Sequence, residues 1–458
     1  MTARLMLWAC LLQVSPGVAQ PALKIISRHR SFAASNYSIY PDQNLPQLTP
    51  APEGKLPFYI SHYGRHGSRY LNQRKAFDIP HAMLLRADSL GQLTATGRKV
   101  LQTVENILAD TKERWGDLTG YGRKQHNDIA RRMIKNFPEV FADSAHVDAR
   151  STVVNRCIVS MGAAMQELAC NNQKLKIDME ASKRDMWFLN HQDPVLRKSA
   201  MVEKAKQAYN NIADSLQGNP RLMRLLFQNP DSVRDVVEDI WLNYYLIKMG
   251  LFQMNTHNYK DTYLTDLFTD DEIYRLWQLE NTWWYIMHGP CPLNGGRQPY
   301  SQRHLLRKII SDADSCIRLD KPGSQLRFGH ETVLLPLACL IGLQMTAKSY
   351  DMPEDQLGDD TDDCPIPGSR FDMEVTNLRE LESRGWWASR VFPMGSNMQF
   401  IFYRRDPQDQ DVLFKVLLNE REAALPIDTD LSPYYRWADF RNYYLKKIDD
   451  YEQTLKNK

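Results

Sequence analysis

The chain lacks a strong net charge of either sign. Among its 458 residues, 57 are Lys or Arg and 55 are Asp or Glu, which leaves a formal net charge of +2. A charge this small produces no overall field that would steer the protein onto nucleic acid or a membrane surface. We therefore expect no nucleic-acid partner, and any anion must be bound by a local cluster of cations.

Cysteine, glycine and proline are also scarce. The seven cysteines include no CxxC pair, so we expect no structural zinc. Six of them lie beyond the first 19 residues and allow fifteen pairings, among which the sequence does not choose. These are Cys157, Cys170, Cys291, Cys316, Cys339 and Cys364. With 22 Gly and 24 Pro, the chain is neither fibrous nor of low complexity.

Long hydrophobic runs are missing except at the N-terminus. The best internal candidate, Val333 to Met345, is shorter than the ~20 apolar residues that a membrane span needs. The apolar run Leu5 to Leu12 follows one basic residue and precedes small residues, which predicts a signal peptide over residues 1–19 with cleavage after Ala19 or Gln20. The alternative is a buried N-terminal helix or strand. We expect an exported protein that is periplasmic, secreted or surface-associated.

Strand patterns followed by sharp turns and helices predict an α/β fold. The expected strands are Leu56 to Ser61, Val147 to Ala149, Gln325 to Phe328, Asn397 to Tyr403 and Val412 to Leu418. Between the second and third of them, residues 170–318 show mostly helical patterns. We therefore expect an α/β core from residues 20–169 and 319–458, with residues 170–318 inserted as a mostly α-helical cap. Ligands of such sheets bind at the carboxyl ends of the strands.

The first expected strand runs into the sequence Arg65-His66-Gly67-Ser68-Arg69, which places one imidazole between two guanidinium groups. Guanidinium binds phosphate in a planar, bidentate manner. Two neighbouring cations also disfavour protonation of the histidine, so a neutral ring nitrogen is available as a nucleophile. The alternative for this segment alone is a basic surface turn with a hydrogen-bonded histidine.

Two more polar groups follow the next strands along the chain. Arg150 comes at the end of the second strand, and Thr152 is placed to cap the helix that follows. His330 and Glu331 come after the third strand, where His330 can donate to an anion. A glutamate buried beside apolar groups has a raised pKa, which would let Glu331 supply a proton. Each of these motifs alone is weak evidence for a function, but together the three motifs favour phosphoryl transfer.

These three motifs, Arg65-His66-Gly67-Ser68-Arg69, Arg150-Ser151-Thr152 and His330-Glu331, resemble the ordered signatures of the histidine phosphatase superfamily, acid-phosphatase branch. With Tyr70 after the second arginine, the first motif resembles that of multiple inositol polyphosphate phosphatases. The phytases have a small residue and proline at this point. The adjacent His330 and Glu331 depart from the subgroup, which typically has His-Ala-Glu.

The resemblance implies a phosphoglycerate-mutase-like α/β sandwich core and a role for each motif residue. His66 would attack phosphorus and become phosphohistidine, and Glu331 would protonate the leaving alcohol and then activate water. The phosphate oxygens would be held by Arg65, Arg69, Arg150 and His330. The resemblance implies no metal and no cofactor.

The expected substrates are small phosphorylated molecules, namely inositol polyphosphates of the phytate type and also 2,3-bisphosphoglycerate. Arg74 and Lys75 are candidates for binding outer phosphates, although a solvated face is an equal alternative. The Trp283-Trp284-Tyr285 run is expected in the core. Two other functions stay open, namely a broad-specificity acid or sugar phosphatase on the same scaffold and a non-catalytic phosphate binder.

Overall fold

The structure is a computed structural model that describes most of the chain. It covers residues 21–42, 44–214, 218–256, 263–319, 322–345 and 369–456. The predicted signal peptide and Cys364 lie outside these residues. The five other cysteines beyond residue 19 lie within them, and all five are free thiols.

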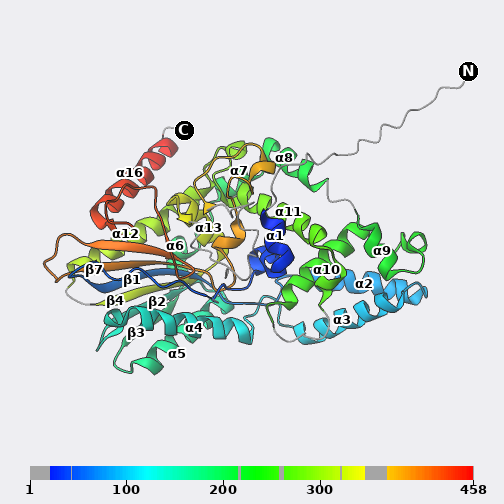
Figure 1. The fold of residues 1–458 in the computed structure, drawn as a ribbon, viewed down its shortest axis with the longest axis horizontal. Helices are drawn as coiled ribbons and strands as arrows, with labels where there is room; N and C mark the ends of the chain where they lie inside the picture. The colour runs from blue at the N-terminus through cyan, green and yellow to red at the C-terminus, as the bar shows by residue number, and fades with distance from the viewer. Residues whose placement is uncertain are drawn as a thin grey trace, which may run out of the picture.

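A mixed sheet of eight strands forms the centre of the molecule (Figure 1). Its order is β10-β8-β7-β1-β4-β2-β3, and β9 pairs with β8. The strands are β1 (Leu56–Arg65), β2 (His146–Ser151), β3 (Lys176–Ala181), β4 (Gly323–Gly329), β7 (Asn397–Arg404), β8 (Leu413–Leu418), β9 (Arg421–Ala423) and β10 (Tyr435–Arg436). The short strands β5 (Gln344–Met345) and β6 (Ser369–Arg370) pair separately.

The register of the parallel strands brings the sequence motifs to one edge of the sheet. Arg65 lies opposite Gly329 in the β1–β4 pair, and Ser151 lies opposite Phe328 in the β2–β4 pair. The carboxyl ends of β1, β4 and β2 therefore meet, as expected for the ligand-binding edge of an α/β sheet. Strand β7 runs antiparallel to β1 on its other side.

Helices cover both faces of the sheet, which confirms the predicted α/β class. One face packs against α4 (Gly120–Asn136) and α5 (Asn155–Asn171), through a core that includes Met133, Val147, Met161 and Leu326. The other face packs against α12 (Arg303–Arg318), α13 (Glu331–Leu340) and α16 (Trp437–Lys456). Figure 1 shows α4 and α5 on one side of the strands and α12 and α16 on the other.

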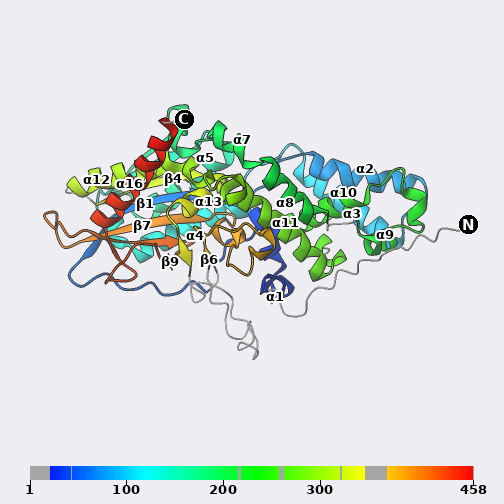
Figure 2. The ribbon, with the colours of Figure 1, turned by 90° about the horizontal axis from the view of Figure 1, so that it is seen from above.

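A second core lies in the helical cap beside the sheet (Figures 1 and 2). It joins α9 (Pro220–Leu226), α10 (Asp239–Gln253) and α11 (Asp270–His288) to α2 (Lys75–Ser89) and α3 (Ala95–Thr111). The N-terminal α1 (Pro21–Arg28) and the 3-10 helix η1 (Arg30–Tyr37) pack into the same core.

The cap boundaries differ from the predicted insertion of residues 170–318. Strand β3 belongs to the sheet, because it pairs with β2 along its length. Charged residues occupy alternate positions of this edge strand, so it shows no continuous apolar run. Helix α12 also packs on the sheet, and α2 and α3 belong to the cap although their sequence precedes it.

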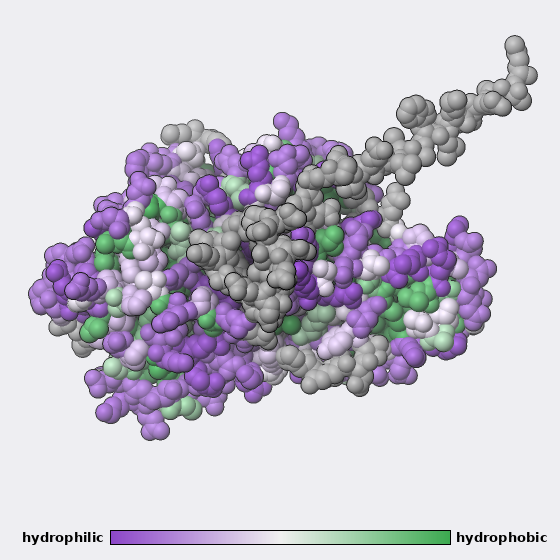
Figure 3. Space-filling model, in the orientation of Figure 1, coloured by the Kyte–Doolittle hydropathy of each residue, from purple (hydrophilic) through white to green (hydrophobic). Residues whose placement is uncertain are grey.

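The remaining cap and surface elements are short. They are α6 (Met186–Leu189), α7 (Pro194–Ala200), α8 (Glu203–Ala213) and α15 (Ala388–Val391), with 3-10 turns between them. The face seen in Figure 3 is mostly hydrophilic, with hydrophobic residues scattered among polar ones. Within the described ranges, no helix combines the length and the apolar character that crossing a membrane requires.

Candidate active site

The loop after β1 is fixed at the carboxyl edge of the sheet by its backbone. The His66 N–H donates to the Gly329 carbonyl at 3.0 Å, and the Arg65 N–H donates to the Ser396 carbonyl at 2.7 Å. Gly67 packs directly on the backbone of Gly122, where a Cβ atom would collide with the peptide group. Glycine is therefore required at position 67, and the loop is pinned against α4.

The His66 imidazole is fully buried, and its hydrogen bond defines its tautomer. Nδ1 lies 2.9 Å from the Gly67 carbonyl oxygen, which can only accept a hydrogen bond, so Nδ1 carries the proton. Nε2 then keeps its lone pair, and it has no hydrogen-bond partner within the described part of the chain. Burial, together with Arg65 and Arg69, holds the pKa of His66 well below its ordinary value. His66 is thus neutral, with a lone pair available on Nε2.

Three guanidinium groups surround this imidazole. Arg65 and Arg69 are buried, and each is anchored through Nη1, Arg65 to the Phe392 carbonyl at 2.6 Å and Arg69 to the Tyr37 hydroxyl. The buried Arg65 Nη2, Arg69 Nε and Arg156 Nε have no hydrogen-bond partner among the residues that the structure describes. Leaving such donors unpaired costs about 1–3 kcal/mol each, so the arrangement favours an anion with several acceptor oxygens.

Arg156 is a site residue that sequence reasoning missed. It lies in the first turn of α5, directly after β2, and its Nη1 donates to the Gly116 carbonyl at 3.4 Å. Burial, Arg65 and Arg69 are the largest causes of the lowered pKa of His66, and the charge of Arg156 is the next. The available signal was its position at a helix N-terminus after a parallel strand, where anion-binding groups gather.

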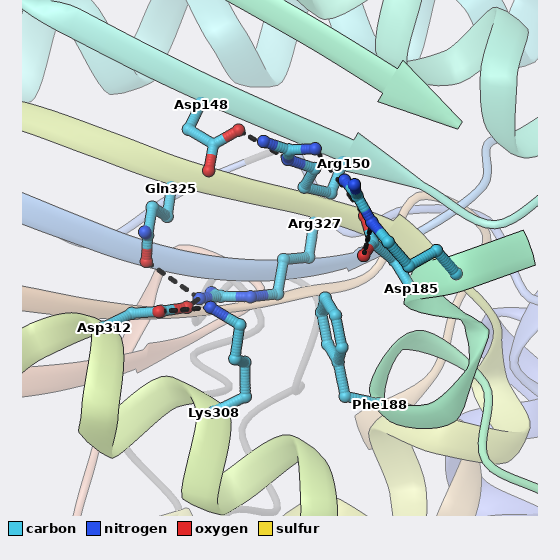
Figure 4. Close-up of a pocket in the computed structure, with 9 residues that line it drawn as sticks. Asp148, Arg150, Asp185, Phe188, Lys308, Asp312, Gln325 and Arg327 are labelled. Carbon is cyan, nitrogen blue, oxygen red and sulfur yellow. Dashed lines mark hydrogen bonds and ion pairs between the residues drawn. The ribbon is translucent and has the colours of Figure 1, made fainter. Parts of the chain in front are cut away.

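Arg150, which the motif assigned to phosphate, is not brought into this group. Side chains alternate along β2, so Arg150 lies on the same face as Asp148. Its Nε donates to Asp148 at 2.6 Å, and its Nη1 pairs with Glu180 of β3. Arg150 lines a separate cavity of about 200 Å³. Figure 4 shows it among the residues that line this cavity, which include Arg327 and Asp312.

Glu331 begins α13 and reaches into the guanidinium group. Its Oε2 lies 3.0 Å from Arg65 Nε and 3.8 Å from His66 Nε2, and its Oε1 accepts a hydrogen bond from Asn36 Nδ2 at 3.0 Å. Burial alone would raise the pKa of Glu331, as the sequence predicted. Arg65 and Arg69 outweigh burial, and the pKa of Glu331 is lowered below its ordinary value. The carboxylate is therefore ionised before an anion binds.

His330 lies beside His66, with 5.7 Å between the ring centroids. Its Nε2 is 3.3 Å from Thr152 Oγ1, and its backbone N–H donates to the Tyr63 hydroxyl at 3.2 Å. Burial lowers the pKa of His330 to about 4. Thr152 therefore contacts His330 and does not cap α5, whose N-cap is Val154.

The donor atoms of His66, His330 and Glu331 lie within 4.8 Å of one another, close enough to share a metal ion. The three guanidinium groups around them oppose a cation, since like charges repel strongly in a buried site. The same charges attract a phosphoryl group. The residues present fit an anion better than a metal.

A cavity of about 520 Å³ opens beside Arg69. Aromatic side chains form much of its wall, namely Tyr37, Tyr209, Trp241, Tyr244, Tyr245 and Trp283. Trp283 therefore lines the cavity, whereas the adjacent Trp284 and Tyr285 are buried in the core as expected. Lys75 and Lys248 also line it. Arg74 does not, because its exposed side chain pairs with Asp78 at 2.8 Å.

Known families and structures match this arrangement. The family model described as histidine phosphatase superfamily (branch 2) matches residues 64–419. A crystal structure of Bifidobacterium longum multiple inositol polyphosphate phosphatase with inositol hexasulfate is similar, with a TM-score of 0.69 and 16% identity over 89% of this chain and 96% of that chain. The D. castellii phytase gives a TM-score of 0.58 and 12% identity over 94% and 90% of the two chains. No curated sequence matches significantly.

Proposed function

We propose that this chain, which belongs to the histidine phosphatase superfamily (branch 2), hydrolyses phosphate monoesters through a covalent intermediate on His66. The observation that carries the proposal is a neutral, buried His66 among three guanidinium groups, whose Nε2 has no hydrogen-bond partner in the described ranges. A phosphorylated substrate offers oxygens to the arginines and phosphorus to the nitrogen. His330 lies close enough to bind a further oxygen.

The first chemical step transfers the phosphoryl group to the enzyme. The Nε2 lone pair of His66 forms a bond to phosphorus while the bond to the ester oxygen breaks. The arginines stabilise the charge that spreads over the three phosphoryl oxygens. The leaving oxygen takes a proton from Glu331, whose Oε2 lies 3.8 Å from His66 Nε2.

Glu331 is protonated for this step because substrate changes its surroundings. A dianionic phosphoryl group offsets the charges of Arg65 and Arg69, so the pKa of Glu331 rises and the carboxylate takes up a proton. In the second step the ionised Glu331 accepts a proton from water, which attacks phosphorus. The bond from phosphorus to Nε2 then breaks, and inorganic phosphate is released.

The proposed substrates are inositol polyphosphates of the phytate type. Support comes from Lys75 and Lys248 in the cavity beside Arg69, and from the similarity to enzymes whose names include inositol polyphosphate or phytase. One observation favours a second candidate, a broad-specificity acid or sugar phosphatase. Lys248 is already paired with Glu280 at 2.8 Å, so the cavity offers few free cations for outer phosphates.

Phosphate release from phytate and from p-nitrophenyl phosphate tests the function and the substrate class together. We expect turnover of both, a higher kcat/KM for phytate at low salt, and a protein-bound, acid-labile phosphate on rapid denaturation. His66→Ala should abolish both turnover and the protein-bound phosphate while the protein stays folded. Preference for the simple ester would select the second candidate, and turnover of neither would indicate a non-catalytic phosphate binder.

We propose also that the protein is exported, on the strength of the N-terminal pattern over residues 1–19. N-terminal sequencing of the protein from the periplasm, the medium or the cell surface should begin at Gln20 or Pro21. Recovery of the uncut chain from the cytosol alone would contradict export.

A further inference from the structure

The segment before the first strand reaches the candidate active site, although it lies outside the part of the chain that matches the family model. Its start is anchored on the cap, where the Ala22 N–H donates to Glu382 Oε1 at 2.7 Å. Arg30 Nε donates to Asp270 Oδ1 at 3.0 Å, and α1 contacts α11 (Figure 1). From these anchors the chain passes through η1 to the His66 group.

A sharp backbone bend turns this segment into the site. Ser35 is buried and adopts φ 53° and ψ −119°, a conformation that residues with a Cβ atom avoid. Such a conformation costs about 1–3 kcal/mol and persists where surrounding contacts enforce it. Ser38 supplies such contacts, since its N–H and its hydroxyl both donate to the Ser35 carbonyl, at 3.0 and 2.7 Å.

The two residues after the bend contact the catalytic groups directly. Asn36 Nδ2 donates to Glu331 Oε1 at 3.0 Å. The Tyr37 hydroxyl accepts from Arg69 Nη1, and the Tyr37 ring lies 4.6 Å from the centre of the Arg69 guanidinium group. The Tyr37 carbonyl accepts from the buried Asn255 Nδ2 of the cap. The segment is thus held from both sides at the point where it meets Glu331.

We propose that Asn36 is a positioning residue for Glu331, which holds Oε1 so that Oε2 is the oxygen that gives and takes the proton. The proposal rests on the proposed phosphatase function. In the unliganded protein both carboxylate oxygens face donors, Oε1 the Asn36 amide at 3.0 Å and Oε2 the Arg65 Nε at 3.0 Å. A bound phosphoryl group takes Arg65 as its own partner, whereas Asn36 keeps donating to Oε1, so the proton is carried on Oε2, the oxygen 3.8 Å from His66 Nε2.

Loss of this hydrogen bond has a specific kinetic signature. Once the phosphoryl group has engaged Arg65, a Glu331 carboxyl group without Asn36 can rotate, and the proton can sit on the oxygen that faces away from the ester. Alkyl leaving groups need the proton, whereas p-nitrophenolate leaves readily without it. The carboxylate also loses a stabilising donor, so the pH limbs that belong to Glu331 move to higher pH.

The test compares Asn36→Ala with wild type on an alkyl phosphate and on p-nitrophenyl phosphate. A general acid contributes about 10²–10⁴-fold, and we expect loss of positioning to lower kcat about 10-fold on the alkyl ester with much less effect on the nitrophenyl ester. Ser27→Ala is the matched control, because it removes a hydrogen bond of the same segment, from the Ser27 hydroxyl to the Lys24 carbonyl at 2.8 Å, away from the bend at Ser35 and from Glu331. In a Glu331→Gln background, Asn36→Ala should cause no further leaving-group effect.

Each outcome decides the proposal. Equal losses on both esters in a folded Asn36→Ala protein, or an unmoved pH profile, would overturn the positioning role and leave the proposed function standing. If Asn36→Ala is unstable, the nearly isosteric Asn36→Leu provides the same comparison. A wild type that hydrolyses neither ester would refute the proposed function, and the inference with it.

Discussion

Replacing Arg156 tests the site most sharply, because the chain supplies a matched control in Arg150. Both are partly exposed arginines, one at the end of β2 and the other in the first turn of the following helix. The charge of Arg156 acts on His66, whereas Arg150 pairs with Asp148 and Glu180 and is not among the main charges that act on His66. We expect Arg156→Gln to lose activity and Arg150→Gln to keep it.

The size of the loss follows from a donor on Arg156. Its Nε is buried without a partner among the described residues, and a charge-assisted hydrogen bond to a phosphoryl oxygen is worth about 1.5–3 kcal/mol. Since ~1.4 kcal/mol is a factor of ten, kcat/KM should fall by about 10- to 150-fold. Removing the charge also raises the pKa of His66 toward its ordinary value, so the loss should grow as the pH is lowered.

Kinetics at several pH values and thermal melting of both variants decide the matter. Arg150→Gln should lower stability slightly, because a partly exposed ion pair contributes about 0–1 kcal/mol, and should leave kcat/KM near that of wild type. The reasoning fails if Arg150→Gln loses more activity than Arg156→Gln in folded protein. The phosphate would then be bound by Arg150, as the motif alone indicated.

Three other experiments probe the acid, the cavity and the metal. Glu331→Gln keeps the shape of the side chain but removes its proton, so kcat should fall by about 10²-fold or more for alkyl esters and far less for p-nitrophenyl phosphate; equal losses would point to another acid. Lys75→Ala should lower kcat/KM for phytate more than for p-nitrophenyl phosphate, whereas Arg74→Ala, which removes only the pair with Asp78, should change neither; equal effects of the two variants would exclude a specific role for Lys75. Chelator should leave activity unchanged and vanadate should inhibit, and reversible inactivation by chelator would reveal a metal among His66, His330 and Glu331.

The sheet was predictable where its strands are buried on both faces. The buried strands β1, β7 and β8 carry apolar stretches, and β4 has Leu326 and Phe328 next to a glycine; all four were predicted from the sequence. Strand β3 was missed because an edge strand with charged residues at alternate positions needs only weak apolar character. The helical cap was predicted as one insertion, but its core also includes residues of α2 and α3, which lie far from the predicted insertion in the sequence.

The site was predictable where one motif holds the chemistry together in sequence. Arg65, His66 and Arg69 share one loop, and the structure keeps them in one group. The choice between Arg150 and Arg156 depends on the face of β2 that Arg150 occupies and on the turn from β2 into α5 that places Arg156, and spacing alone defines neither. Asn36 lies in a segment without a motif, and only the bend at Ser35 brings it to Glu331.

The electrostatics of the site link binding of substrate to movement of a proton. Arg65 and Arg69 lower the pKa values of both His66 and Glu331, so the unliganded protein holds a neutral nucleophile and an ionised acid. A phosphate dianion offsets those charges and raises the pKa of Glu331. When a ligand raises the pKa of a protein group, that group takes up a proton on binding, and the ligand therefore binds more tightly at lower pH. In the proposed mechanism Glu331 is therefore protonated only when the phosphoryl group is in place, and it becomes a base again as the leaving alcohol departs with that proton.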